Sequence, residues 1–149
     1  MAYKRRLLKE MQTLLDLSIP GLKFIPTEDG INHWYVDINI VDNPIYDPAH
    51  AFRLEIVAGD EYPIEPPMVK FIGQEIPLHP HVYSNGHICL NILGDGWTPA
   101  QSIRSIALSI QSMLQGNTKN ERPPDDERYI SHAPQNPRSS GWVYHDDNV

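Results

Sequence analysis

Alternation of apolar and polar side chains over residues 34–40, and again over residues 52–56, constrains the fold of this chain most. A period of two is typical of a β-strand that buries one face. Shorter apolar runs at 22–25 and 68–72 predict two further strands. Because the connections between these segments are short and rich in Asp, Pro and Gly, we expect successive strands to pair in a four-stranded antiparallel meander.

Two helices are expected to flank these strands. Residues 2–17 space leucine and methionine side chains three and four positions apart, which predicts an amphipathic helix with a basic opposite face. Its predicted apolar face comprises Leu7, Leu8, Met11, Leu14 and Leu15. A second helix should begin at Thr98 as its cap, with Pro99 in the first helical position and Gln101 completing a capping box. This helix ends near Gly116 and should cover one face of the sheet, which gives an α+β domain.

Composition is typical of a globular protein with one domain. Hydrophobic residues make up 40% of the sequence and charged residues 21%, and no apolar run reaches the roughly 18 residues of a membrane span. The net charge of −7 argues against nucleic acid as the main partner. A single cysteine excludes an intramolecular disulfide and fits a reducing compartment, so we expect the protein in the cytoplasm and nucleus.

The sequence divides into a core domain, residues 1–132, and a C-terminal tail, residues 133–149. A short helix is expected near the end of the core, around residues 125–131. Trp142 and Tyr144 stand among polar residues in the tail, and two aromatic side chains in that setting favour packing against the core. The pattern leaves open whether the tail is flexible.

Residues 79–93 hold the only cysteine of the chain and three of its seven histidines. A lone thiol among imidazoles indicates a nucleophile or a metal ligand, and the alternative is a buried structural cysteine. As a nucleophile, Cys89 could serve a cysteine hydrolase with His81 or His87 as its base. As a ligand, Cys89 could form a structural zinc site with all three histidines, His79 included, although such sites usually join two ligand pairs across a longer loop.

Five short motifs follow one another in a distinctive order. They are Tyr62-Pro63-Ile64-Glu65-Pro66-Pro67, His79-Pro80, Cys89-Leu90, Trp97-Thr98-Pro99-Ala100 and Pro123-Pro124-Asp125-Asp126. Together with the basic N-terminal helix and the meander, this order resembles the ubiquitin-conjugating enzyme family over residues 3–132. The resemblance implies the family's ubiquitin-conjugating (UBC) fold, which has an N-terminal helix, a four-stranded antiparallel meander and a central helix after the active-site cysteine. The C-terminal region is expected to be atypical.

Three departures from the usual pattern narrow the resemblance to the W-type enzymes of this family. His81 stands where most members have asparagine, Asn91 stands where most have an acidic residue, and the ending around Trp142 differs from the usual last helices. The W-type enzymes transfer ubiquitin to the α-amino group of a protein's first residue and prefer substrates with flexible N-termini. The resemblance therefore implies N-terminal monoubiquitination, with lysine-directed conjugation as the alternative. Non-enzymatic variants of the fold lack the cysteine that this chain retains as Cys89.

The resemblance also implies roles for individual residues. Cys89 would carry ubiquitin as a thioester, and His81 would donate a hydrogen bond to the oxyanion, brace the loop or act as a base. Asp125 and Asp126 would orient or deprotonate the incoming amine. The residues expected to support the site are His79, Asn91 and Trp142. Trp142 would either pack near the cysteine or anchor the tail.

The partners implied by the resemblance are ubiquitin, its activating enzyme, RING or U-box ubiquitin ligases, and protein substrates. ATP is used upstream by the activating enzyme, so the chain itself is expected to need no cofactor and no metal. The surface that would bind ligases comprises Arg5, Arg6, Ile64, Pro99 and Ala100. The basic face of the first helix would also fit an acidic domain of the activating enzyme.

Overall fold

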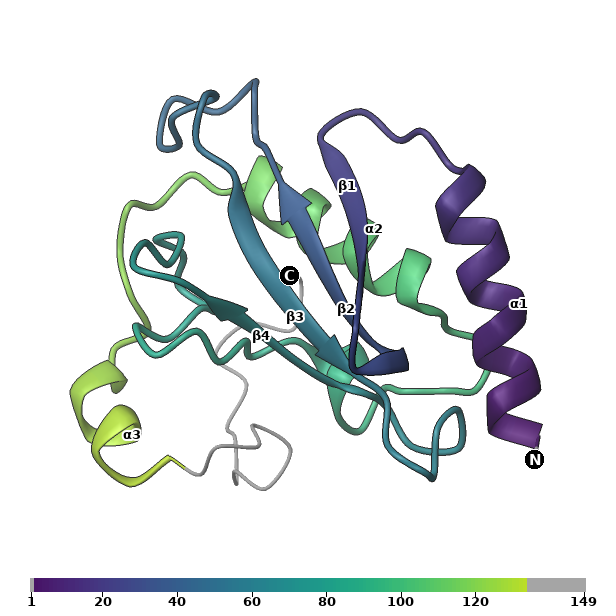
Figure 1. Ribbon diagram of the computed structural model, residues 1–149. Helices are drawn as coiled ribbons and strands as arrows, with labels where there is room; N and C mark the ends of the chain where they lie inside the picture. Colours follow the sequence, from purple (N-terminus) through teal and green to yellow (C-terminus); the bar gives the residue numbers. More distant parts are fainter. Residues whose placement is uncertain (1, 134–149) are drawn as a thin grey trace.

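Figure 1 shows a computed structural model of the chain, in which residues 2–133 are described. Four strands form one antiparallel sheet in chain order: β1 (Leu22–Thr27), β2 (Gly30–Ile38), β3 (Phe52–Val57) and β4 (Met68–Ile72). The predicted meander is therefore confirmed, and β4 has the predicted bounds. The alternation of apolar and polar residues continues two residues beyond the end of β2, to Ile40, which is buried although it lies outside the strand.

Three helices and one 3-10 turn complete the described residues. They are α1 (Ala2–Asp16), η1 (Asn91–Leu93), α2 (Ile103–Gln115) and α3 (Asp126–His132). α2 lies behind the sheet, whereas α1 and α3 stand at opposite sides of the molecule (Figure 1). The short helix expected near the end of the core is confirmed as α3. Within residues 2–133, no helix has both the length and the apolar character needed to cross a bilayer.

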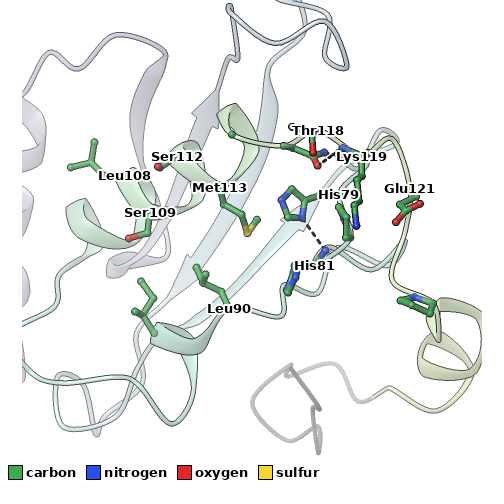
Figure 2. A pocket seen from close by; sticks show the side chains of 15 residues that line it. His79, His81, Leu90, Leu108, Ser109, Ser112, Met113, Thr118, Lys119 and Glu121 are labelled. Atoms are coloured by element: carbon green, nitrogen blue, oxygen red, sulfur yellow. Dashed lines mark hydrogen bonds between the residues drawn. The ribbon is translucent and has the colours of Figure 1, made fainter. Parts of the chain in front are cut away.

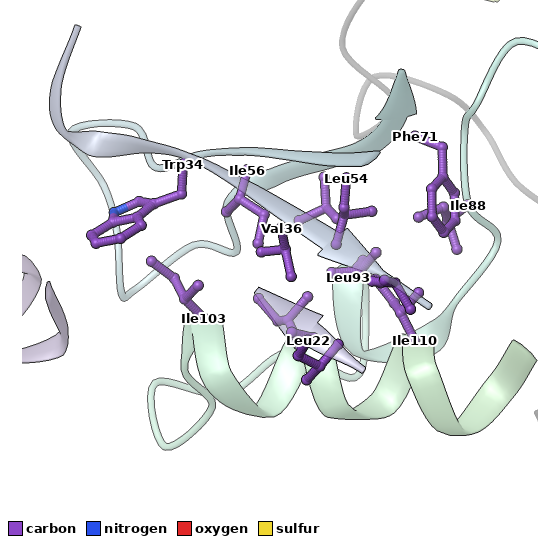
Figure 3. Close-up of a cluster of buried hydrophobic side chains, with 14 of the residues drawn as sticks. Leu22, Trp34, Val36, Leu54, Ile56, Phe71, Ile88, Leu93, Ile103 and Ile110 are labelled. Carbon is purple, nitrogen blue, oxygen red and sulfur yellow. The ribbon is translucent and has the colours of Figure 1, made fainter. Parts of the chain in front are cut away.

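The core lies between one face of the sheet and α2 (Figure 3). Three cross-strand pairs of β2 and β3 bury their side chains there: Trp34 with Ile56, Val36 with Leu54, and Ile38 with Phe52. The buried residues of α2 are Ile103, Ile106, Ala107, Ile110, Met113 and Leu114. Burial of a large apolar side chain contributes roughly 1.5–3 kcal/mol. This contact therefore fixes α2 firmly on the sheet.

The buried face of α1 is narrower than predicted. Leu7 and Leu14 are buried and Met11 packs against the core, as expected. Leu8 and Leu15 are 44% and 56% exposed, so the prediction that they belong to the buried face is wrong. Successive residues of a helix point about 100° apart, and these two leucines fall beyond the edge of the stripe that faces the core.

α2 begins four residues later than predicted. Ser102, and not Thr98, occupies the cap position: its hydroxyl accepts the Ser105 backbone N–H at 3.1 Å, and the Ser105 hydroxyl accepts the Ser102 N–H at 2.7 Å. The backbone at Thr98 forms a turn instead, closed by a hydrogen bond from the N–H of Gln101 at 3.0 Å. The prediction of a helix start at Thr98 is wrong because this reciprocal serine pair caps the helix further along.

The carboxylate of Glu10 joins α1 to the start of α2. One of its oxygens accepts the backbone N–H of Ile103 at 2.8 Å, and the other accepts the Tyr62 hydroxyl and the Arg6 guanidinium. Arg6 also lies 5.7 Å from the centre of the Tyr62 ring and donates to the carbonyl of Pro99 at 3.0 Å. These five residues, here named the Glu10 junction, fix two surface loops against α1.

Candidate active site

Residues 79–90, here named the histidine loop, fold back so that their two halves lie side by side. The backbone N–H of Cys89 donates to the carbonyl of His81 at 2.8 Å, and the N–H of Gly86 closes the turn by donating to the carbonyl of Tyr83 at 2.9 Å. Gly86 has a φ of 93°, which glycine adopts without strain. A Cβ atom at this position would also lie 2.0 Å from a carbonyl oxygen of β4. The turn therefore requires glycine.

The side chain of Cys89 is buried in the second half of this loop. Burial, with a smaller contribution from the carboxylate of Asp125, raises the pKa of the Cys89 thiol to about 12. At pH 7, roughly one thiol in 100,000 is then ionised. The sulfur is held in its neutral form at this pH, so a reaction at this atom requires removal of its proton.

His81 is buried, and it contacts the backbone on both sides of the site. Its Nδ1 lies 3.2 Å from the carbonyl oxygen of Cys89, and because a carbonyl only accepts, Nδ1 carries the proton. Its own backbone N–H donates to Nδ1 of His79 at 2.9 Å. The structure therefore places the His81 ring where it supports the backbone at Cys89.

His79 is buried in a neutral form. Burial is the main cause that lowers the pKa of His79 to about 4, and the nearby His81 ring lowers it further. A hydrogen bond with the backbone of Met113 acts in the opposite direction. The imidazole thus connects the histidine loop to α2.

A zinc site built from Cys89 and the three histidines is not compatible with this geometry. No three His, Cys, Asp or Glu side chains within residues 2–133 are placed to hold a metal ion. Nδ1 of His79 accepts a backbone N–H, Nδ1 of His81 donates to a carbonyl, and Nδ1 of His87 lies 2.7 Å from the hydroxyl of Tyr129. The structure therefore does not bring these four side chains together as zinc ligands, and their imidazoles contact the backbone of the loop and α3 instead.

The acidic pair predicted from sequence does meet the histidine loop, but its two members differ. The Asp125 carboxylate accepts the Tyr83 hydroxyl, with O···O distances of 3.2 and 3.4 Å, and it is close enough to Cys89 to raise the thiol's pKa. Asp126 accepts both the backbone N–H and the hydroxyl of Ser84, each at 2.8 Å. Asp125 holds the cap position of α3 without a capping hydrogen bond from its side chain. Of the two acids, Asp125 is thus the one whose charge raises the pKa of the thiol.

An open cavity of about 810 Å³ adjoins the histidine loop (Figure 2). His81 and Leu90, which flank Cys89 in the folded loop, line one side of it. The other sides come from α2 and from the loop after it, and include Leu108, Ser109, Ser112, Met113, Lys119 and Glu121. Asn91 does not line this cavity; its side chain is exposed at the start of η1. Trp142 lies outside the described residues.

Arg122 is a site-forming residue that sequence reasoning missed. Its guanidinium is half-buried and donates to three backbone carbonyls: Ile76 at 2.8 Å, Pro77 at 2.7 Å and Val82 at 3.1 Å. These carbonyls lie on both sides of the histidine pair, so one side chain fixes both ends of that segment. No spacing or motif around Arg122 indicated this role.

Two tyrosines beside the acidic pair were also missed. The rings of Tyr83 and Tyr129 stack with centroids 3.8 Å apart and planes 18° apart. A signal for Tyr129 was present in the sequence, since it follows Asp125 by four positions on an expected helix and therefore shares its face.

Four of the five residues predicted to bind ligases are exposed. Arg5, Pro99 and Ala100 are exposed, and Ile64 is 71% exposed. Arg6 differs, because its guanidinium bonds to backbone carbonyls of the loop before α2 and to the carboxylate of the Glu10 junction. Arg6 therefore holds the loop that carries Pro99 and Ala100 in place.

Comparisons with known proteins agree with this fold and motif order. Residues 6–140 match the family model described as "Ubiquitin-conjugating enzyme". "Ubiquitin-conjugating enzyme E2 W" of Caenorhabditis elegans is 40% identical over 150 residues, which cover 99% of this chain and 98% of that protein. "Probable ubiquitin-conjugating enzyme E2 W" of Dictyostelium discoideum is 43% identical, with coverage of 99% and 97%.

A solved structure is similar over nearly the same length. The crystal structure of ubiquitin conjugating enzyme E2 UbcA1 from Agrocybe aegerita superposes with a TM-score of 0.85 at 38% identity, and covers 91% of this chain and 97% of its own. The resemblance found in the sequence motifs, including that to the W-type enzymes, is therefore confirmed. The chain belongs to the ubiquitin-conjugating enzyme family.

Proposed function

We propose that this chain accepts ubiquitin from the activating enzyme as a thioester on Cys89 and transfers it to the α-amino group of a protein's first residue. The observation that carries the proposal is the placement of the only cysteine close to the Asp125 carboxylate, in a loop whose residues His81 and Leu90 line an open cavity. Similarity to proteins named E2 W over nearly the whole chain supports it.

Charging and discharge balance without a metal or a nucleotide bound to this chain. In charging, Sγ of Cys89 attacks the ubiquitin thioester carbonyl, and the thiol proton passes to the sulfur of the activating enzyme as it leaves. In discharge, the substrate amine attacks the same carbonyl carbon, the C–S bond breaks, and the proton that the amine loses returns to Sγ. ATP is consumed upstream, when the activating enzyme makes the first thioester. What this site supplies is orientation of the two reacting groups.

Asp125 and His81 supply that orientation in our proposal. The Asp125 carboxylate, next to the sulfur, accepts a hydrogen bond from the incoming amine and aligns it. The His81 ring braces the backbone of Cys89 through the bond from Nδ1 to the Cys89 carbonyl. We assign His81 this bracing role because the Nδ1 proton is already used there.

The acid–base properties of amines favour N-terminal acceptors. An α-amine has an ordinary pKa of about 7.7–8.0, against about 10.4 for lysine, so the neutral form is more abundant by roughly two orders of magnitude at pH 7.4. His79 and His81 are both engaged by the backbone, which limits their use as bases for a lysine. A site that deprotonates amines weakly therefore selects the α-amine.

We further propose that ubiquitin, the activating enzyme and RING or U-box ligases are the partners. The exposed residues that support ligase binding are Arg5, Ile64, Pro99 and Ala100. The 810 Å³ cavity, which His81 and Leu90 help to line, is large enough for a segment of polypeptide. Lys4, Arg5 and Lys9 make the exposed side of α1 basic, which suits an acidic domain of the activating enzyme.

The test is to charge the enzyme with ubiquitin, activating enzyme and ATP, and then to offer acceptors. A reductant-sensitive adduct should form on the wild type and not on Cys89→Ala. A lysine-free peptide with a free N-terminus should discharge it, while the same peptide with an acetylated N-terminus and free lysine should not. Discharge by lysine alone would refute N-terminal selectivity, and absence of the adduct would refute the thioester. His81→Asn should retain the adduct but discharge more slowly.

A further inference from the structure

α3 rests on the histidine loop without burying a side chain. None of its seven residues is buried in the described structure, and Ile130, its largest aliphatic residue, is 41% exposed. Apolar burial, which fixes α2 on the sheet, therefore does not fix α3. Its position depends on specific contacts with the loop.

Tyr129 makes the most extensive of these contacts. Its ring stacks on Tyr83 at a centroid distance of 3.8 Å, and its hydroxyl lies 2.7 Å from Nδ1 of His87. The His87 ring also packs edge-on against Tyr129, with centroids 5.6 Å apart. Stacked and edge-on rings fix both distance and orientation. Tyr129 is thus held from two sides of the same loop.

Asp125 is connected to this stack at two points. The Tyr83 hydroxyl donates to the Asp125 carboxylate, and the backbone N–H of Tyr129 donates to the Asp125 carbonyl at 2.9 Å. Movement of Tyr129 would therefore move both the carboxylate's hydrogen-bond donor and its backbone. The contact of Asp126 with Ser84 gives α3 a second attachment, one residue further along each segment than the contact of Asp125 with Tyr83.

We propose that Tyr129 is a positioning residue, which holds the Asp125 carboxylate beside Cys89 by stacking on Tyr83 and bonding to His87. This inference rests on the proposed function, because it assigns Tyr129 a part in the transfer step. The groups that interact electrostatically with the thiol are the Asp125 carboxylate and the Tyr83 hydroxyl, while the His81 ring binds the Cys89 carbonyl.

The position of Asp125 affects the two half-reactions in opposite ways. A carboxylate near the sulfur disfavours the thiolate through repulsion of like charges, so it slows attack by Cys89. The same carboxylate aligns the amine that later attacks the thioester, so it speeds discharge. A substitution that releases Asp125 should make the thiol more reactive and the discharge slower. Simple loss of structure would weaken charging and discharge together.

The experiment compares Tyr129→Ala with Tyr129→Phe and with Ile130→Ala. Alanine is the strongest helix former, so α3 remains helical while the stack and the bond to His87 are lost. Phenylalanine keeps the stack and loses only the hydroxyl. Ile130→Ala is the matched control, because it removes an exposed side chain from the next position of the same helix.

The first readout is alkylation of the only cysteine by iodoacetamide at pH 8, which needs neither ubiquitin nor the activating enzyme. Tyr129→Ala should raise the alkylation rate about tenfold, the effect expected when removal of a nearby like charge lowers a thiol pKa by about one pH unit. Asp125→Asn should raise it to a similar extent. Adding Tyr129→Ala to Asp125→Asn should change nothing further. A rate that still rises in that background would mean greater exposure of the sulfur and would overturn the proposal.

The second readout is discharge of the ubiquitin thioester to a peptide with a free N-terminus. Tyr129→Ala should slow this step ten- to hundredfold, the range expected for a misplaced catalytic group. Tyr129→Phe should restore most of the rate, and Ile130→Ala should match the wild type. Equal discharge by Tyr129→Ala and the wild type would overturn the role of Tyr129 without affecting the thioester itself. Absence of any adduct on Cys89 would instead reject the proposed function, whatever the alkylation result.

Discussion

The imidazole of His79 accepts the backbone N–H of His81, so its Nδ1 must carry no proton in the folded protein. Burial and the neighbouring His81 ring lower its pKa to about 4, whereas in an unfolded chain it should titrate at about 6.5. Between these two values the unfolded state binds a proton that the folded state does not. The free energy of unfolding therefore decreases as the pH falls through this interval.

We expect this single residue to account for up to about 3 kcal/mol of stability lost between pH 6.5 and pH 4. His79→Asn keeps a side-chain acceptor for the His81 N–H but does not titrate, so its stability should depend less on pH. Urea unfolding of both proteins at pH 7, 6, 5 and 4.5 gives the measurement. Identical pH dependence in the wild type and the variant would contradict the prediction.

Arg6 shows why some roles of single residues could not be predicted from the sequence. Its position in a basic helix indicated a surface for partners, yet its guanidinium donates to the carbonyls of Pro99 and Gln101, more than 90 positions away in the chain. Local patterns carry no information about a contact of that separation. Arg122 was missed for the same reason, since the carbonyls it binds have no sequence signature.

At the level of elements, the Glu10 junction connects α1 to the first turn of α2. In the capping box at the start of α2, the Ser102 hydroxyl accepts the backbone N–H of Ser105 but leaves that of Ile103 without a partner inside the helix. The Glu10 carboxylate accepts this N–H. It also provides the acceptor for the hydroxyl of Tyr62, a residue only 2% exposed.

Replacement of Glu10 by alanine should cost about 2–4 kcal/mol of stability. The change removes the acceptor for the Tyr62 hydroxyl and for one helix N–H, and unsatisfied buried donors cost about 1–3 kcal/mol each. Glu61→Ala is the matched control, because Glu61 is exposed, and it should shift stability by less than about 0.5 kcal/mol. Chemical denaturation of the three proteins decides the matter: equal effects of the two alanine variants would show that the junction contributes little.

The boundaries of the elements show what local sequence could predict. Two strands follow from a period-two pattern and two from short apolar runs, signals that each segment carries by itself, and so all four were predicted. The start of α2 depends on which of two neighbouring caps is used, and the observed start also uses a carboxylate from α1. Leu8 and Leu15 matched the helical spacing, but the width of the buried stripe depends on what packs against α1. The order of the motifs located the cysteine and the two acids. The different contacts of Asp125 and Asp126 could not be predicted, because both acids bond to residues that are distant in the sequence.

Across the whole molecule, stability is distributed unevenly. β2, β3 and α2 share one apolar core, while α3 buries no side chain within the described residues. Local opening is easiest where few apolar contacts resist it.

Hydrogen exchange should therefore separate these regions. We expect the backbone amides of α3 to exchange at least about a hundredfold faster than those of β3 and α2 at neutral pH, because opening of α3 exposes little apolar surface. Mass spectrometry of peptic fragments measures this directly. Protection of α3 equal to that of α2 would show that α3 unfolds only with the core.

The consecutive pairing of β1 to β4 has a consequence for a chain emerging from the ribosome. Each strand finds its neighbour among residues already synthesised, so the ladder is complete once Ile72 has appeared. The thiol at position 89 is translated after that, and the segment that carries Asp125 and Tyr129 follows still later. The carboxylate that adds to the effect of burial on the pKa of this thiol is thus translated after both the strands and the cysteine.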